Sequence, residues 1–358
     1  MNQEDKKIQE ERLEDSAADR REAKRIWLVA GTGAAVVLLI AAAAVLWGLL
    51  RPEEETPAQA SVWEGTMTEV SAMDVMCEPS GIAAMADGSL LVTDTYGKLV
   101  WRVQNGISTV YAGGTTVEDP YGEPVGGYND ADPEGSYFKN PWAIAPFLDG
   151  YAVTDTDNNA VRLIQKDSIQ TINGSTQEDL MMTDMGVAYD HPTGLASDEE
   201  GNLYIADTLQ NAVRKITPEG LVTTFADNLS DPMGLCWKDR ALYAAETGAN
   251  RIVKIEEGTV SVVAGCGTDG MENGAADQAS FSMPQGVAVG DDGTVYVADT
   301  GNSAIRRIRD GEVTTLVERD VEDLGAFAPV SPVGLLVQGK QLYICDNFSR
   351  KVFSVSLE

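Results

Sequence analysis

The chain repeats one unit, in which a short apolar run ends on an acidic residue, a polar turn follows, and a second apolar run comes next. The clearest copy is YVADTGNSAIRRI, from Tyr296 to Ile308. Six copies aligned on the acid all carry an aliphatic residue six positions later and another nine positions later. The aligned acids are Asp94, Asp155, Asp207, Glu246, Asp299 and Asp346. Agreement at both offsets in all six copies identifies a repeat protein.

Each unit has the pattern of four short strands. A proline opens the first strand, a Gly/Asp turn leads to the second strand, and the acid ends that strand. Two further apolar runs follow, as in VRKI and VTTF. The opening prolines are Pro79, Pro141, Pro192, Pro232, Pro284 and Pro332. With no helical pattern between the units, this predicts an all-β fold, a six-bladed β-propeller of four-stranded blades over residues 61–358.

The last unit has only three strands before the sequence stops at Glu358. Residues 61–73, SVWEGTMTEVSAM, contain TMTEV, which resembles the fourth strands of the other units. We therefore expect 61–73 to supply the closing strand of the last blade, because pairing the two ends of the repeat removes free sheet edges.

The repeated acid has a mechanical interpretation and a functional one. Asp followed by Thr, with Asn nearby, can cap a tight turn by accepting backbone N–H groups. The turn asparagines are Asn159, Asn211, Asn250 and Asn302. We expect the six acids to be structural turn caps, and the alternative is that they ring a cation.

An apolar segment precedes the repeats. Residues 26–50 hold 25 uncharged, mostly apolar positions, and about 20 residues suffice to span a bilayer. This predicts a single transmembrane helix over 26–50. Basic residues crowd the preceding flank, which predicts a cytoplasmic charged tail over 1–25 and an extracytoplasmic head. Residues 51–60 then form a linker. The alternative is a cleaved signal peptide, because Ala58-Gln59-Ala60 matches a cleavage site.

Charge and composition narrow the function. The chain has a net charge of −30, and residues 51–358 contribute −29, from 19 basic and 48 acidic residues. Such a head repels nucleic acid, whereas it can attract cations or a basic partner. The single histidine, His191, excludes a multi-histidine metal site. Cys236 and Cys345 occupy positions where other repeats have small residues, so we expect them in the core, and Cys77 could approach the last blade.

Two connections between units are longer than the rest, 112–141 and 264–284. Each starts with Ala-Gly, has a Gly/Asp-rich centre, and carries a phenylalanine before the next proline, Phe138 or Phe281. Asp130, Asp132, Glu134 and Gly135 fit the opening of a calcium loop, but its twelfth position falls on Pro141, so the match fails. Tyr121, Tyr128 and Tyr137, with Trp142, could form a glycan or peptide platform, and the alternative is loop packing.

The motifs PTGLA…GNLYIADTLQNAVRKI (192–216) and PQGVAV…GTVYVADTGNSAIRRI (284–308) resemble the NHL-repeat family of β-propellers. The resemblance covers roughly 79–358 and implies the propeller fold. The family includes protein- and RNA-binding modules, extracellular sensor heads and a zinc-dependent amidating lyase. Its zinc enzymes place histidines just after the opening proline, where this chain has no histidine. These positions hold Ser80, Trp142, Thr193, Met233, Gln285 and Val333.

Two hypotheses follow. The first is a membrane-anchored, extracytoplasmic, non-enzymatic binding, sensor or scaffold module without a cofactor, whose ligand is a protein, peptide or glycan. Its binding face would hold the residues after the prolines and the tyrosines of the first long connection. The second is a divalent-metal hydrolase or lyase at the channel mouth, because related lactonase-like propellers hold an ion there. Its ligands would be the pre-proline residues Glu78, Asn140 and Asp231, with calcium or another divalent ion.

Overall fold

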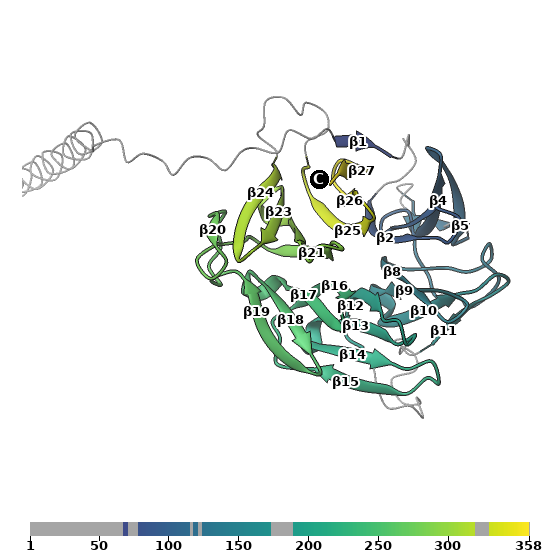
Figure 1. The fold of residues 1–358 in the computed structure, drawn as a ribbon. Helices are drawn as coiled ribbons and strands as arrows, with labels where there is room; N and C mark the ends of the chain where they lie inside the picture. The colour runs from purple at the N-terminus through teal and green to yellow at the C-terminus, as the bar shows by residue number, and fades with distance from the viewer. Residues whose placement is uncertain are drawn as a thin grey trace, which may run out of the picture. The chain divides into compact units, whose positions relative to one another are not determined.

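The computed structural model describes residues 67–70, 78–114, 117–120, 124–172, 189–318 and 329–357, all within one compact unit, Ser61–Glu358. These residues form six antiparallel sheets around a central axis, which is the predicted six-bladed β-propeller (Figure 1). The first strands of the blades lie at the centre and contact one another in ring order, β2, β8, β12, β16, β21, β25 and back to β2.

Blades 1 to 4 have their strands in chain order from the axis outward, whereas blades 5 and 6 add β20 and β1 as their outermost strands. Blade 1 holds β2 (Pro79–Ala84), β3 (Leu90–Asp94), β4 (Leu99–Gln104) and β5 (Ile107–Ala112). Blade 2 holds β8 (Pro141–Phe147), β9 (Gly150–Asp155), β10 (Ala160–Ile164) and β11 (Ile169–Thr171). Blade 3 holds β12 (Pro192–Ser197), β13 (Leu203–Asp207), β14 (Ala212–Ile216) and β15 (Val222–Ala226).

Blade 4 holds β16 (Pro232–Lys238), β17 (Ala241–Glu246), β18 (Arg251–Glu256) and β19 (Thr259–Ala264). Blade 5 holds β21 (Pro284–Val289), β22 (Val295–Asp299), β23 (Ala304–Arg309) and β24 (Glu312–Glu318), with β20 (Gly274–Ala275) as a fifth strand. Blade 6 holds β25 (Pro332–Gln338), β26 (Gln341–Asp346), β27 (Lys351–Ser356) and β1 (Met67–Glu69). A separate hairpin pairs β6 (Val117–Glu118) with β7 (Pro124–Val125).

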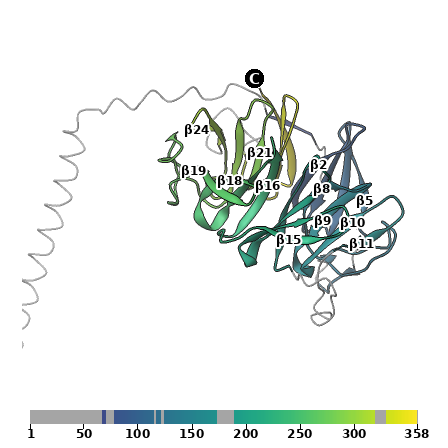
Figure 2. The same ribbon diagram turned by 60° about the horizontal axis from the view of Figure 1, so that its bottom comes forward.

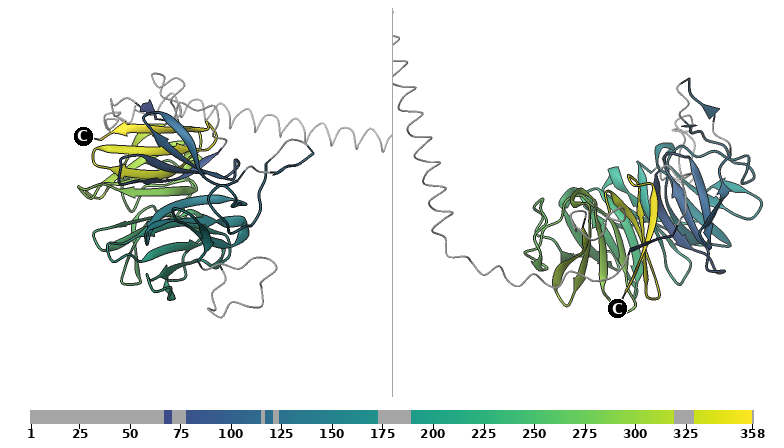
Figure 3. Two further views of the ribbon diagram at one scale, coloured as in Figure 1. Left: turned by 90° about the vertical axis from the view of Figure 1, so that its right-hand side faces the viewer. Right: turned by 90° about the horizontal axis from the view of Figure 1, so that it is seen from above.

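The ring closes at blade 6. Strand β1 pairs antiparallel with β27, with Met67 opposite Val355 and Glu69 opposite Phe353. The fourth strand of this blade therefore comes from within 61–73, where the sequence predicts it. Figures 2 and 3 show the N-terminal blade, in blue, beside the C-terminal blade, in yellow.

Four helical turns of the 3-10 type follow the second strands of blades 2 to 5. They are η1 (Thr156–Asn158), η2 (Thr208–Gln210), η3 (Thr247–Ala249) and η4 (Thr300–Asn302). Because the first strand of a blade runs away from its proline and the second runs back, these turns share one end of the ring with the prolines and the connections between blades. We call this end the Pro face.

The glycine two places after the proline permits close contact at the axis. A Cβ on Gly334 would lie 1.9 Å from the carbonyl oxygen of Ser80, and one on Gly194 would lie 1.9 Å from that of Met233. No side chain fits at these distances, so the backbones of neighbouring first strands touch directly. This explains the Pro-x-Gly pattern at the start of most units.

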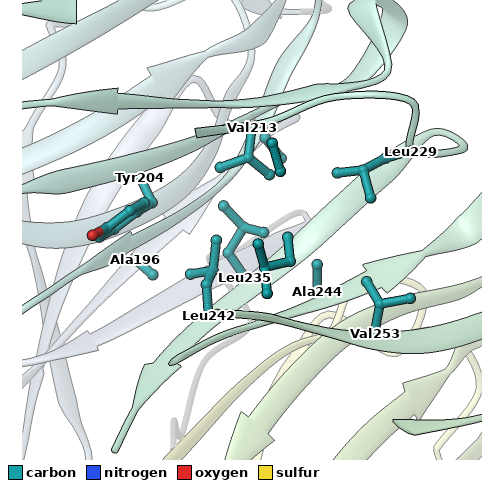
Figure 4. Close-up of a cluster of buried hydrophobic side chains, with 11 residues drawn as sticks. Ala196, Tyr204, Val213, Leu229, Leu235, Leu242, Ala244 and Val253 are labelled. Atoms are coloured by element: carbon teal, nitrogen blue, oxygen red, sulfur yellow. The ribbon is translucent and has the colours of Figure 1, made fainter. Parts of the chain in front are cut away.

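The apolar core lies between neighbouring blades. In one cluster, Tyr204 and Val213 of blade 3 pack with Leu235, Leu242 and Val253 of blade 4 (Figure 4). Cys345 is buried in another cluster, as expected, whereas Cys236 is only half-buried. Both thiols are free and burial raises the pKa of each, that of Cys236 to about 11. Cys77 lies outside the described residues.

The described residues contain no helix long and apolar enough to cross a membrane. The segments predicted as tail, membrane helix and linker, 1–25, 26–50 and 51–60, lie outside the described residues.

Candidate functional site: the Pro face and its channel

The six repeated acids are fully buried. Each accepts a backbone N–H from the residues just before the proline of its own blade. Asp155 Oδ1 accepts from Lys139 N at 2.8 Å and from Asn140 N at 3.0 Å, and Asp207 Oδ1 accepts from Asp190 N at 2.7 Å. The other four bonds come from Glu78, Ser230, Ser282 and Val330. The acid thus fastens the entry of the first strand to the end of the second.

Four of the acids also pair with an arginine of the third strand. Arg162 Nη1 lies 3.0 Å from Asp155 Oδ2, and Arg306 Nη1 lies 2.7 Å from Asp299 Oδ2, with all four side chains fully buried. Arg214 and Arg251 pair with Asp207 and Glu246. Burial raises the pKa of Asp155, Asp207 and Asp299, while the backbone donors and the guanidinium groups act in the opposite direction.

The predicted role of the acids as turn caps is right for two and wrong for four. Gly97 N donates to Asp94 Oδ1 at 2.8 Å and Ser349 N donates to Asp346 Oδ1 at 2.9 Å. In the other four blades the acid makes no side-chain cap to its 3-10 turn. The reason is that one oxygen accepts the N–H before the proline and the other faces the arginine. In blades 2 and 5 this second oxygen also accepts from the turn side chains Asn158 Nδ2 and Asn302 Nδ2, at 2.7 and 2.8 Å. None of the six acids lines the channel.

The threonine after the acid has a function that the sequence reading missed. Thr247 Oγ1 donates to the carbonyl of Pro284 in the next blade at 2.6 Å, and Thr300 Oγ1 donates to that of Pro332 at 2.7 Å. Thr156 and Thr208 donate in the same way to Pro192 and Pro232. The signal was the Asp-Thr pair itself, whose threonine we assigned to its own turn instead of to the neighbouring blade.

Three of the four turn asparagines, Asn159, Asn211 and Asn250, also act between blades, whereas Asn302 donates to Asp299 Oδ2 of its own blade at 2.8 Å. Asn159 Oδ1 accepts the N–H of His191 at 2.9 Å, and Asn250 Oδ1 accepts that of Met283 at 2.8 Å. The pre-proline residue that donates has a positive φ, 50° at His191 and 47° at Met283, a conformation that L residues rarely adopt. The asparagine bond holds this strained residue at the surface of the Pro face.

The central channel is narrow. It encloses about 70 Å³ and is lined by first-strand residues, mostly glycine and aliphatic side chains. Of the predicted binding-face residues, Ser80, Trp142 and Gln285 line it, whereas Thr193 and Met233 do not. This volume holds a few water molecules and leaves no room for a macromolecular ligand inside the channel.

The residues proposed for a metal are engaged elsewhere or lie apart from the channel. Glu78 Oε2 accepts from Thr95 at 3.2 Å, and Asn140 Nδ2 donates to Asp157 Oδ1 at 3.3 Å. Neither they nor Asp231 line the channel. In the part of the chain that the structure describes, no group of three or more His, Cys, Asp or Glu side chains could hold a metal ion.

A buried arginine of blade 2 binds the first long connection, 112–141. Arg162 donates to the carbonyls of Asn129 and Tyr137 and to Asp130, and its guanidinium lies 4.8 Å from the ring of Tyr128. Asp130 is therefore part of an ion pair, which explains why the calcium-loop pattern in this connection is misleading. Asp132 likewise accepts the N–H of Gly135.

The second long connection, 264–284, is bound by a buried arginine in the same way. Arg306 donates to the carbonyls of Glu272 and Ser280 and to Asn273 Oδ1, and it lies 5.2 Å from the ring of Phe281. The two connections lead into blades 2 and 5, which stand three blades apart in the ring. Each connection is therefore a fixed element of the Pro face.

The predicted aromatic platform is divided. Tyr128 is 42% exposed and its hydroxyl forms a hydrogen bond with Thr171. Tyr137 is half-buried and its backbone carbonyl accepts a hydrogen bond from Arg162. Trp142 lies at the channel, and Tyr121 lies outside the described residues. Sequence reasoning missed three exposed apolar side chains on this face, Leu209, Met283 and Phe348, which are 51%, 55% and 73% exposed. The signal for Leu209 and Phe348 was an apolar residue in a turn whose other copies are Gly, Asp or Tyr, and that for Met283 was an apolar residue before the proline, where the other copies are polar.

The sequence profile of the Teneurin NHL domain matches residues 182–332. Protein SUPPRESSOR OF QUENCHING 1, chloroplastic, of Arabidopsis thaliana is 28% identical over 186 residues, covering 43% of this chain and 17% of that protein. NHL repeat-containing protein 2 of Bos taurus is 25% identical over 224 residues, covering 46% of this chain and 31% of that protein. The chain thus spans less than a third of either relative.

Among solved structures, virginiamycin B lyase from Staphylococcus aureus has a TM-score of 0.56 at 15% identity, covering 82% of this chain and 100% of that one. A gluconolactonase from Xanthomonas campestris has a TM-score of 0.57 at 14% identity, covering 82% and 90%. At such identities the likeness shows the fold alone. The repeat motifs, the six blades and the matched profile agree, and together they support the NHL-repeat family of β-propellers for this chain.

Proposed function

We propose that this protein is a non-enzymatic binding module that holds a protein, peptide or glycan on the surface of its Pro face, as a sensor or scaffold. The observation that carries the proposal is the exposure of large apolar side chains on this face. Tyr128, Leu209, Met283 and Phe348 stand on four different blades or connections and are 42% to 73% exposed. Exposed apolar side chains on a rigid frame are typical of interaction surfaces.

The frame beneath these side chains supports the proposal. The buried acids, their arginines and the cross-blade threonine bonds fix the turns and connections that carry the exposed residues. Binding to a surface that is already ordered costs little conformational entropy, so modest contacts give useful affinity.

The experiment compares the two faces of the ring. A photoreactive benzoylphenylalanine is placed in the full-length protein at Phe348 or Met283, and in a matched control at Leu148, which is 54% exposed in a turn of the opposite face. We expect one shared cross-linked partner from the first two positions and none from Leu148. Capture by the probe at Phe348 should be lost in the variant Met283→Ser, and capture by the probe at Met283 should be lost in Phe348→Ser. Equal cross-linking from both faces would refute the proposal.

We further propose that residues 26–50 anchor the protein in the cell membrane, with 1–25 in the cytoplasm and the propeller outside, as the flanking charges predict. Cys266 offers a direct test because its side chain is exposed and free. A membrane-impermeant maleimide should label it in intact cells, and a Cys266→Ser variant should lose that label. Labelling only after lysis would reverse the proposed orientation.

The alternative function, a divalent-metal hydrolase or lyase, rests on Glu78, Asn140 and Asp231. Titration of the full-length protein with Ca²⁺ and with Zn²⁺, followed by calorimetry, separates it from the binding module. Uptake of one ion that is lost in Glu78→Gln and Asp231→Asn would favour the alternative. Uptake that these variants leave unchanged, or no uptake, would remove it.

A further inference from the structure

The outermost strands of the blades differ in whether a further segment of the chain pairs with them. In blade 5, β20 pairs along β24, with Gly274 opposite Val313 and Ala275 opposite Glu312. In blade 2, Ile169 N of β11 donates to the carbonyl of Ala131 at 2.6 Å, and Thr171 N donates to Asp130 Oδ2 at 2.9 Å. Each of these edges is covered by the long connection that enters its blade.

Among the described residues, four blades have no such pairing segment along their outermost strand, which is β5, β15, β19 or β1. Strands β15 and β1 have only five and three residues and expose no large apolar side chain, so the long apolar open edges are β5 of blade 1 and β19 of blade 4. Strands β5 and β19 have six residues each, and in the described part of the chain no strand pairs with their outer side. Each strand leads directly into one of the two long connections, which turns away to cover the edge of the next blade. In the described residues, the two long connections therefore cover the edges of blades 2 and 5 and leave the edges β5 and β19 unpaired.

Both open strands are apolar and uncharged. Their sequences are ISTVYA and TVSVVA, in a chain of which 23% is charged. Ile107 and Val110 of β5 are 68% and 52% exposed, and Val260 and Val262 of β19 are 36% and 52% exposed. Proteins usually block an open edge with charge, proline or a bulge that turns it away. Here the exposed positions of both edges carry β-branched side chains instead.

We propose that the edges β5 and β19 are sites of strand addition for an extended segment of a partner protein. The protein itself shows the mode, since β20 adds to β24 as a fifth strand. The segment would form backbone hydrogen bonds along the open edge, and its β-branched or apolar side chains would pack on the exposed valines and isoleucine.

The negative charge of the protein indicates which kind of segment would bind these two edges. Glu256 ends β18 and Glu257 lies in the turn that leads into β19, and residues 51–358 have a net charge of −29, from 19 basic minus 48 acidic residues. A second copy of the chain would bring the same negative charge to the contact and be repelled. A segment with an uncharged centre and lysine or arginine at its ends is attracted instead.

The probe is a synthetic ten-residue peptide, a Thr-Val repeat of six residues with two lysines at each end, added to the full-length protein. We expect it to slow amide hydrogen exchange in 107–112 and 259–264. Methylating the three valine nitrogens in one peptide and the three threonine nitrogens in another tests backbone pairing. Antiparallel pairing uses alternate N–H groups, so one of the two should bind about tenfold or more weakly than the parent.

Matched variants locate the contact. Val110→Lys and Val262→Lys place a charge on the two edges, and Leu148→Lys places one at a position that is 54% exposed in the turn between β8 and β9, away from any outer edge. We expect the first pair to lose binding and the third to keep it. Binding that is insensitive to methylation in both peptides, protection elsewhere, or no binding at the solubility limit of the peptide would overturn the proposal. The methylated peptides keep the test valid if an edge variant unfolds.

Discussion

The threonine bonds between blades make a sharp prediction for stability. Thr247 is buried, and its hydroxyl donates to the carbonyl of Pro284 across the junction of blades 4 and 5 at 2.6 Å. In Thr247→Val the side chain keeps nearly the same volume, but the carbonyl loses its donor. Removing one partner of a buried hydrogen bond costs about 1–3 kcal/mol, so we expect a loss of about 2 kcal/mol in the free energy of unfolding.

The assay is urea denaturation of the full-length protein followed by tryptophan fluorescence, with circular dichroism as a second probe of the same transition. Thr223→Val is the matched control, since Thr223 is exposed on β15 and its replacement should stay within about 0.5 kcal/mol of the parent. If Thr247→Val costs no more than this control, the bond between the blades contributes nothing measurable and the reasoning fails.

Three further predictions concern the same frame. Asn347 stands at the position where four blades carry the threonine that bonds the next blade. Asn347→Thr should therefore add a hydrogen bond between blades 6 and 1 and raise the free energy of unfolding by about 0.5–1 kcal/mol in the same assay. Arg306→Met strips Asp299 of its buried partner and should cost about 3–5 kcal/mol, whereas the exposed-pair control Lys254→Met should cost less than about 1 kcal/mol. The backbone N–H of Thr294 holds the pKa of Asp292 below its usual 3.8, so this stabilisation is present above that pH and is lost as the pH falls through the lowered pKa. Asp292→Asn should flatten the pH dependence of stability below about pH 4, and an unchanged slope would refute this.

The fold could be predicted because the repeat supplies six independent readings of one pattern. An aliphatic residue such as Val213 or Ile305 recurs at a fixed distance from the acid, and both side chains are fully buried. The source of the closing strand was also accessible, since a blade with three strands leaves an unpaired edge and TMTEV resembles the missing element. Local periodicity and counting were sufficient for these conclusions.

The partners of the repeated residues could not be predicted in the same way. Asp155 bonds Asn140, fifteen positions earlier, and Thr156 bonds Pro192, thirty-six positions later. A turn cap satisfies the same donors and acceptors within a few residues, so the local interpretation is consistent with the sequence yet wrong in four blades. Only the ring places the proline of one blade against the turn of the blade before it.

Blades 6 and 1, where the two ends of the repeat meet, differ from the other four blades in the residues around the acid. Blades 6 and 1 have no arginine where Arg162 and Arg306 stand, and they carry Phe353 and Trp101 there. In the described residues, neither blade bonds the next blade's proline through a threonine after the acid, because Asn347 replaces it in blade 6 and Thr95 bonds Glu78 of its own blade. These two blades keep the acid as a true turn cap, so the turn is stabilised locally where this threonine bond to the next blade is missing. At the junction of blades 1 and 2, Thr93 Oγ1 donates instead to the carbonyl of Trp142 at 2.7 Å. We infer that the junction of blades 6 and 1 is the weakest of the ring, which is where amide exchange should begin on mild denaturation.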